Sequence, residues 1–238
     1  GNQNVFNLCG VTAIADTTSG VRSITFTYNG SNCSSTHLRT GTVVASMPAG
    51  VRWKNAGAVV TVSFQDFKIT RIKDSKSITI NGTQMHTNVS GGLVSQLSTQ
   101  ADIIHTVRSN NMSLTFNDNT QRTWQVARRR VFTYNNGIVV SSSGIGTSGT
   151  ITNAAEWGTN RFGRTFTTSI IEPLIIRQDC SWRLTSGKIK HEGFAALTVH
   201  FGLNASGSLT TCPGTGNYYY TLTWTGPGGN SRIVTLPY

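Results

Sequence analysis

The stretch AVVTVSFQDF, Ala58–Phe67, decides the fold class of this chain. Up to Phe64 its apolar residues alternate with polar or small ones, which is the pattern of a β-strand with one buried face. The alternation then changes phase, because the next apolar residue, Phe67, occupies the other parity. We therefore predict a bulge in this strand, or the end of its pairing, near Gln65 and Asp66.

The same alternation recurs along the whole chain, in SITFTY, SITI, SLTF, RTWQV, RTFTTSI, SWRL, ALTVHF and YYYTLTW. Turn sequences such as YNGSN, NGTQ and GPGG separate these segments. About a dozen short strands at this spacing predict an all-β fold, a mainly antiparallel sandwich or barrel-like sheet. In GGLVSQLSTQAD, Leu93 and Leu97 stand four positions apart, so we predict one short helix near residues 92–100.

The chain length of 238 residues suits one large domain or two small ones. No Pro-rich or Ser-rich segment is long enough to be a linker between domains. We therefore predict a single all-β domain over residues 1–238. The segment SSSGIGTSG, Ser141–Gly149, separates two parts of comparable pattern, so two similar β subdomains, about 1–140 and 150–238, are the alternative.

The net charge of +11 would favour partners that carry negative charge. The basic residues are scattered except in the run Arg128–Arg130, where Arg128 and Arg130 would share one face of a strand and Arg129 would face the other way. Trp53 lies between two basic residues in a predicted turn, where an exposed indole could bind a ligand. The candidate binding residues are Arg52, Trp53, Lys54, Arg128 and Arg130.

The four cysteines indicate crosslinks rather than a metal site or a reactive thiol. They are Cys9, Cys33, Cys180 and Cys212. They form no C-x-x-C pair, so a zinc site is not expected. An even number at wide spacing favours disulfides and an oxidising compartment. Three pairings are possible, of which Cys9 with Cys33 and Cys180 with Cys212 enclose the shortest loops.

Motifs of catalysis are missing from the sequence. There is no G-x-S-x-G, no H-E-x-x-H and no lysine-bearing phosphate loop, and the histidines are not paired along any strand. Gly144, Gly146 and Gly149 have the spacing of a dinucleotide fingerprint, but β-branched residues follow them where a helix would be needed. We expect no cofactor and no metal. The alternative is a glycan-acting hydrolase with a carboxylate pair, drawn from Asp66, Glu156, Glu172, Asp179 and Glu192.

Three segments of the chain resemble a family of uncharacterised secreted lipoproteins of Bacteroidetes-type bacteria. These segments are GVRWKNAGAVVTVSFQDF (Gly50–Phe67), RTWQVARRR (Arg122–Arg130) and GTNRFGRTFTTSIIEPLIIRQDCSWRLTSGKI (Gly158–Ile189). The resemblance implies export and a lipid attached to a cysteine that precedes Gly1. It implies no activity, and an acidic loop of the family is replaced here by GLNASGSLTTC.

These observations together predict an exported protein of the periplasm or cell surface, anchored by a lipid at the outer membrane. The start at Gly1 rather than Met fits an expectation that a leader has been removed. Without catalytic motifs, the expected role is a noncatalytic binding or structural module that contacts polysaccharide or another envelope protein. We expect no nucleic-acid partner because of the export, and membrane contact only through the N-terminal lipid.

Overall fold

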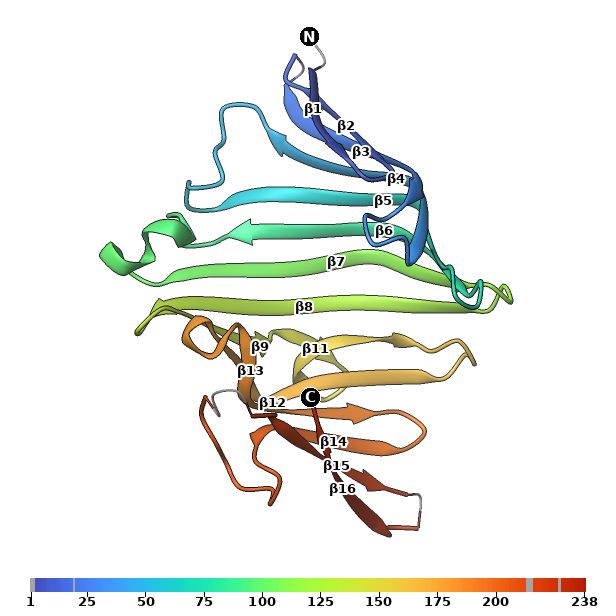
Figure 1. Ribbon diagram of the computed structural model, residues 1–238, viewed down its shortest axis with the longest axis vertical. Helices are drawn as coiled ribbons and strands as arrows, with labels where there is room; N and C mark the ends of the chain where they lie inside the picture. The colour runs from blue at the N-terminus through green and yellow to red at the C-terminus, as the bar shows by residue number, and fades with distance from the viewer. Residues whose placement is uncertain (1–2, 19, 213–215, 227) are drawn as a thin grey trace.

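The computed structural model describes residues 3–18, 20–212, 216–226 and 228–238. In these residues, 16 strands form one antiparallel sheet (Figure 1). The strands are β1 (Gln3–Leu8), β2 (Val11–Asp16), β3 (Val21–Ser31), β4 (His37–Pro48), β5 (Ala58–Arg71), β6 (Ser77–Asn88), β7 (Ile103–Phe116), β8 (Gln121–Tyr134), β9 (Ile138–Gly144), β10 (Gly146–Ser148), β11 (Ile151–Thr159), β12 (Thr165–Arg177), β13 (Arg183–Glu192), β14 (Ala196–Leu203), β15 (Tyr219–Thr225) and β16 (Ser231–Pro237).

The strands follow one another in space almost as they do in sequence. From β1 to β8 and from β11 to β16 each strand pairs with the next, while β9 pairs with both β8 and β12. The predicted all-β, mainly antiparallel fold is confirmed, as a single barrel-like sheet. The strands are more numerous than the dozen predicted, and several are long: β5, β7 and β8 have 14 residues each.

The strands are long because they continue through bulges where the sequence alternation breaks. The bulge predicted near Gln65 and Asp66 is confirmed: the β5–β6 register shifts between Phe64 and Phe67, and Asp66 has a φ of 48°. A similar shift separates Arg108 from Met112 in β7. In the sequence, a break in the alternation looks like the end of a strand, whereas a bulge lets the strand continue past it.

Two glycines allow the sheet to bend at these bulges. Gly41 in β4 lies against the backbone of Asp66, and Gly82 in β6 lies against Asn111 in β7. Both have positive φ, and a Cβ on Gly82 would come within 2.5 Å of the carbonyl oxygen of Asn111. At both glycines, backbone of the neighbouring strand occupies the position that a Cβ would take. The sheet therefore curls toward the face on which the glycines lack a side chain.

The face toward which the sheet curls is apolar, and we call it the concave face. Strand pairing aligns Phe26 with Val43 and Val43 with Phe64 on this face, and Ile80 with Leu114 farther along. The intervening residues point to the opposite, hydroxyl-rich face. Examples on that face are Thr25, Ser63 and Thr83.

The described strands form no second sheet over the concave face, which is covered at one end, where the Trp53 loop packs against His105 and η1 contacts β8. The substantial contacts between strands join partners in the same sheet or strands next to each other at β8 to β11. Residues such as Val62, Phe64 and Ile80 are therefore only half-buried. The accessible surface is 13247 Å², whereas a compact monomer of 25.6 kDa would expose about 10,400 Å².

Two short 3-10 helices interrupt the strands. The first, η1 (Val94–Thr99), lies within the predicted helical segment and buries Leu97, although Leu93 precedes it. The second, η2 (Gln178–Cys180), precedes β13. Within the described residues, no helix has the length and apolar character needed to cross a membrane.

Disulfides join Cys9 to Cys33 and Cys180 to Cys212, with Cα atoms 5.0 and 5.1 Å apart. These are the two pairs that enclose the shortest loops. The described residues contain no free cysteine. Asp179 lies close to the second bridge, but sulfur atoms in a disulfide are not the thiolates that bind a metal ion. The two bridges accord with an oxidising compartment.

Candidate binding site on the concave face

The fold brings Trp53, Arg128 and Arg130 to one end of the concave face. Arg128 and Arg130 pair with Val107 and His105 of β7, while Arg129 pairs with Thr106 on the opposite face. Trp53, from the loop between β4 and β5, packs against His105 with ring centroids 4.9 Å apart. His105 therefore lies between the indole of Trp53 and the strand position of Arg130.

The loop that holds Trp53 is fixed by hydrogen bonds from its neighbours. The side-chain amide of Asn88, which is fully buried, donates to the carbonyl oxygen of Trp53 at 2.8 Å. Gly92 donates to the carbonyl oxygen of Lys54 at 2.9 Å. Trp53 is half-buried as a result, whereas the side chains of Arg52 and Lys54 are exposed on either side of it.

One carboxylate on the concave face binds three side chains of β8. Glu156 of β11 accepts hydrogen bonds from Arg128 at 2.7 Å and from the indole nitrogen of Trp124 at 2.7 Å. Arg122 lies 3.7 Å from the same carboxylate. Glu156 therefore balances the charge of Arg128 and is shared with Arg122.

Arg130 is left without a counter-charge. Its guanidinium forms no ion pair or hydrogen bond with any residue that the structure describes. The side chain is exposed to water, yet protein atoms of the curved face surround it. This partial desolvation, together with repulsion from Arg128, lowers the pKa of Arg130 below its usual value. An anion beside Arg130 would offset both effects.

Two histidines that sequence reading missed complete this end of the concave face. Burial lowers the pKa of His86 and of His105, and the positive charge of Arg130 lowers both pKa values further. The Nε2 atom of His105 is buried and has no hydrogen-bond partner among the described residues. A histidine pair within one strand would be visible as a spacing in the sequence, but these two lie on neighbouring strands. In the sequence, each of these histidines alternates in step with the apolar residues of its own strand, and this alternation was the available signal that it faces the apolar side.

An apolar cavity of about 300 Å³ lies next to this cluster. Ile24, Ala45, Met47 and Val60 contribute its apolar wall. Val60 is the strand partner of His86, so the cavity begins one strand away from His86 and two strands away from His105. We call Trp53, His86, His105 and Arg130 the cationic cluster, and this cavity the apolar cavity.

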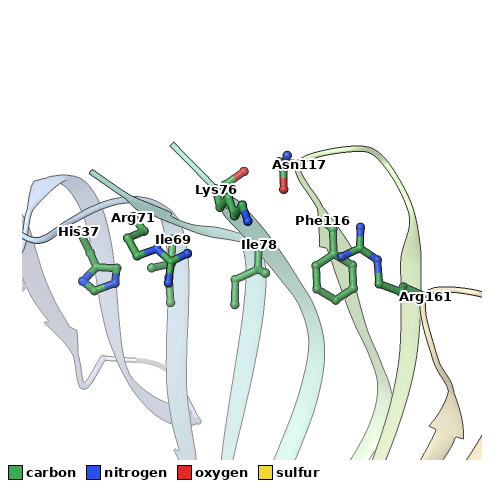
Figure 2. Close-up of a pocket in the computed structure, with 9 residues that line it drawn as sticks. His37, Ile69, Arg71, Lys76, Ile78, Phe116, Asn117 and Arg161 are labelled. Atoms are coloured by element: carbon green, nitrogen blue, oxygen red, sulfur yellow. The ribbon is translucent and has the colours of Figure 1, made fainter. Parts of the chain in front are cut away.

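A second cavity, of about 340 Å³, lies at the opposite ends of the strands (Figure 2). Its apolar floor comes from Ile69, Ile78 and Phe116. Basic side chains surround this floor in Figure 2, but two of them have acidic partners: Arg71 pairs with Asp74, and Arg161 pairs with Asp118. Lys76 and His37 also line the cavity. This end is therefore closer to electrical balance than the cationic cluster.

The five candidate carboxylates do not gather on one face. Glu156 lies on the concave face, whereas Glu172 and Glu192 pair with Lys188 and Thr167 on the opposite face. Salt bridges join Lys188 to Glu172 and Arg177 to Asp179, and hydrogen bonds from these cations lower the pKa of both carboxyl groups. A general acid of a glycosidase needs the opposite shift. Asp66 accepts a hydrogen bond from Asn81, and Glu192 pairs with Lys190.

Comparisons of the chain with models of known protein families, with curated proteins and with solved structures found no match. The resemblance to secreted lipoproteins stays a prediction.

Proposed function

We propose that this chain is a noncatalytic binding module of the cell envelope, and that a partner covers its concave face. The observation that carries the proposal is an apolar sheet face over which the described residues place no second sheet. An apolar sheet face is normally buried against another element. Contiguous exposed apolar patches larger than a few hundred Å² mark interaction sites in soluble proteins.

The two expected partners place different demands on this face. A polysaccharide is rich in hydroxyl groups and would leave residues such as Val62 and Phe64 without apolar contacts. An envelope protein could supply an apolar surface of matching size. The geometry thus favours a partner with apolar surface on the concave face. A polysaccharide would instead suit exposed polar positions such as Arg52 and Lys54.

Location in the periplasm or at the cell surface, with a lipid anchor at the outer membrane, is part of the same proposal. The two disulfides support an oxidising location. Among the described residues, the concave face holds no close carboxylate pair, so the geometry gives no support to the alternative of a glycan-acting hydrolase. No nucleic-acid partner is proposed.

Two adjacent residues on opposite faces provide the test. Val62 points into the concave face and Ser63 points away from it. We expect Val62→Asp to abolish retention of the folded protein on membrane and cell-wall fractions at low salt, because a carboxylate would prevent apolar contact. Ser63→Asp adds the same charge to the other face and should leave retention unchanged.

Circular dichroism of both variants would show that the sheet is intact. Equal retention of the wild type and Val62→Asp would contradict the use of the concave face. Failure of the wild type to bind either fraction would contradict the proposed function itself.

A further inference from the structure

The concave face combines an unbalanced positive charge with apolar surface. Arg122, Arg128 and Arg130 share this face with a single acid, Glu156, in the sheet segment from β6 to β11. Arg130 is the guanidinium without an acidic partner there, and the buried Nε2 atom of His105 beside it also lacks a hydrogen-bond partner among the described residues. The free guanidinium of Arg130 points to a missing anionic ligand.

The surroundings of Arg130 restrict what that ligand can be. Apolar residues adjoin the cationic cluster: Phe132 packs against His105 with ring centroids 4.8 Å apart, and Ile103 is fully buried beside it. Toward β3 the face continues into the apolar cavity. Strand β8 and strand β5 are three strand spacings apart, about 14 Å. A ligand that spans this distance needs one charged end and a long apolar body.

Neutral side chains lie between Arg130 and the apolar cavity, where the body of such a ligand would lie. Burial and the charge of Arg130 lower the pKa of His86, which favours its uncharged form near neutral pH. Val60, opposite His86, is the first residue of the apolar cavity. Arg22 also lines the cavity, but its guanidinium donates a hydrogen bond to the carbonyl oxygen of Val51. The guanidinium without a partner on this path, among the described residues, is therefore Arg130.

A second copy of this chain fits the same face poorly. The chain carries a net charge of +11, and a face-to-face dimer would bring two unbalanced cationic clusters into one interface, where like charges cost several kcal/mol. A concave face also does not match the shape of an identical concave face. A polysaccharide would satisfy Arg130 but not the apolar cavity.

We propose that the concave face binds a fatty-acyl amphiphile with one anionic headgroup. The headgroup pairs with Arg130, while the acyl chain lies across β7 and β6 into the apolar cavity. This inference rests on the proposed function, because it names the ligand of the same face. It makes the module a carrier or receptor for single lipid molecules rather than for a bilayer surface.

Calorimetric titration of the purified chain with oleate, below the micellar concentration, tests the proposal. We expect saturable binding, and a loss of affinity of about tenfold in Arg130→Gln, because a charge-assisted hydrogen bond is removed. Arg129→Gln is the matched control, since it removes the same charge from the opposite face of the same strand. It should leave oleate affinity unchanged.

Two further measurements distinguish the contribution of the headgroup to binding from that of the acyl chain. Oleyl alcohol has the same hydrocarbon chain without the anion, so it should bind more weakly than oleate and should not respond to Arg130→Gln. Ala45→Phe fills the apolar cavity and should weaken both ligands. Circular dichroism would show that each variant keeps its strands.

Absence of oleate binding would overturn the inference, as would equal effects of Arg130→Gln and Arg129→Gln. Binding only to phosphatidylglycerol vesicles, lost with added salt, would also overturn it, because net charge alone explains such adsorption. If oleate fails to bind but Val62→Asp still abolishes retention on envelope fractions, the amphiphile is wrong and the proposed function stands. If neither is observed, both fail.

Discussion

At the scale of single residues, one carboxylate organises most of the charge on the concave face. Glu156 is bound by Arg128 and Trp124 and lies near Arg122, and its side chain is 21% exposed. Removing its charge would leave two guanidiniums on the concave face facing each other without an acid. Removing one charge lowers the free energy of unfolding more in a half-buried network than in an isolated surface pair.

We therefore expect Glu156→Gln to lower the free energy of unfolding by about 1 to 2 kcal/mol. Urea denaturation followed by circular dichroism would measure it. Glu192→Gln is the control, because Glu192 pairs with Lys190 on the surface, where a pair contributes under about 1 kcal/mol. A loss in Glu156→Gln no greater than in the control would show that the network does not stabilise the fold.

The histidines near Arg130 predict how stability depends on pH. The folded-state pKa values of His86 and His105 lie below the ordinary value of 6.5, because of burial and then of Arg130. The unfolded chain therefore binds more protons as the pH falls through 6.5, and stability is full above that pH and is lost below it. His191 has a lowered pKa as well, mainly through burial, and contributes with the same sign.

Thermal unfolding measured between about pH 7 and pH 5 should show this loss. The variant with His86→Gln and His105→Gln should lose less stability than the wild type over the same range, while His191 maintains part of the slope. Parallel curves for the wild type and the variant would mean that the two histidines titrate alike in the folded and unfolded chain.

At the scale of elements, curvature depends on glycines that face bulges. Gly82 in β6 has a φ of +116°, and its missing Cβ makes room for the backbone of Asn111 and Met112 in β7. We expect Gly82→Ala to destabilise the fold by at least about 2 kcal/mol, because an alanine is strained there and also collides with the neighbouring strand. Urea denaturation would measure the loss.

Gly193→Ala is the matched control, since the nearest atom to its Cβ position is the carbonyl oxygen of Thr165 at an ordinary contact distance of 3.6 Å, and its φ lies outside the left-handed region. It should change the free energy of unfolding little. If both variants were equally stable, the close approach of β6 and β7 would not be what bends the sheet.

Local patterns in the sequence were sufficient to predict strands and one bulge, but not the cationic cluster. The alternation in β5 and its change of phase at Gln65 are properties of one strand, so both could be read directly. The contact of Trp53 with His105 depends on the register of β7 and on a loop held by Asn88. Register between strands of different segments has no local signal. Alternation also looks the same whether or not a second layer covers the apolar face.

At the scale of the whole molecule, disulfides stabilise the outer parts of the sheet and long strands stabilise its centre. One disulfide joins the turns of β1–β2 and β3–β4, and the other joins η2 to the loop before β15. Both lie in the outer parts of the sheet. The central strands β5 to β8 have no crosslink among the described residues, and they are held by long backbone ladders.

Because the concave face is only partly covered, we expect side-chain truncations on it to lower the free energy of unfolding by unequal amounts. Ile103 and Ile80 both point to this face, but Ile103 is 1% exposed at the end beside the cationic cluster, whereas Ile80 is only half-buried. For the isolated chain, we expect Ile103→Ala to cost about 2 to 5 kcal/mol, and Ile80→Ala about 1 kcal/mol. Urea denaturation at low protein concentration would measure both free energies. Similar losses in the two variants would mean that Ile80 is already covered in solution, which would happen if copies of the chain associate through this face. A concentration-dependent unfolding midpoint would then identify that association.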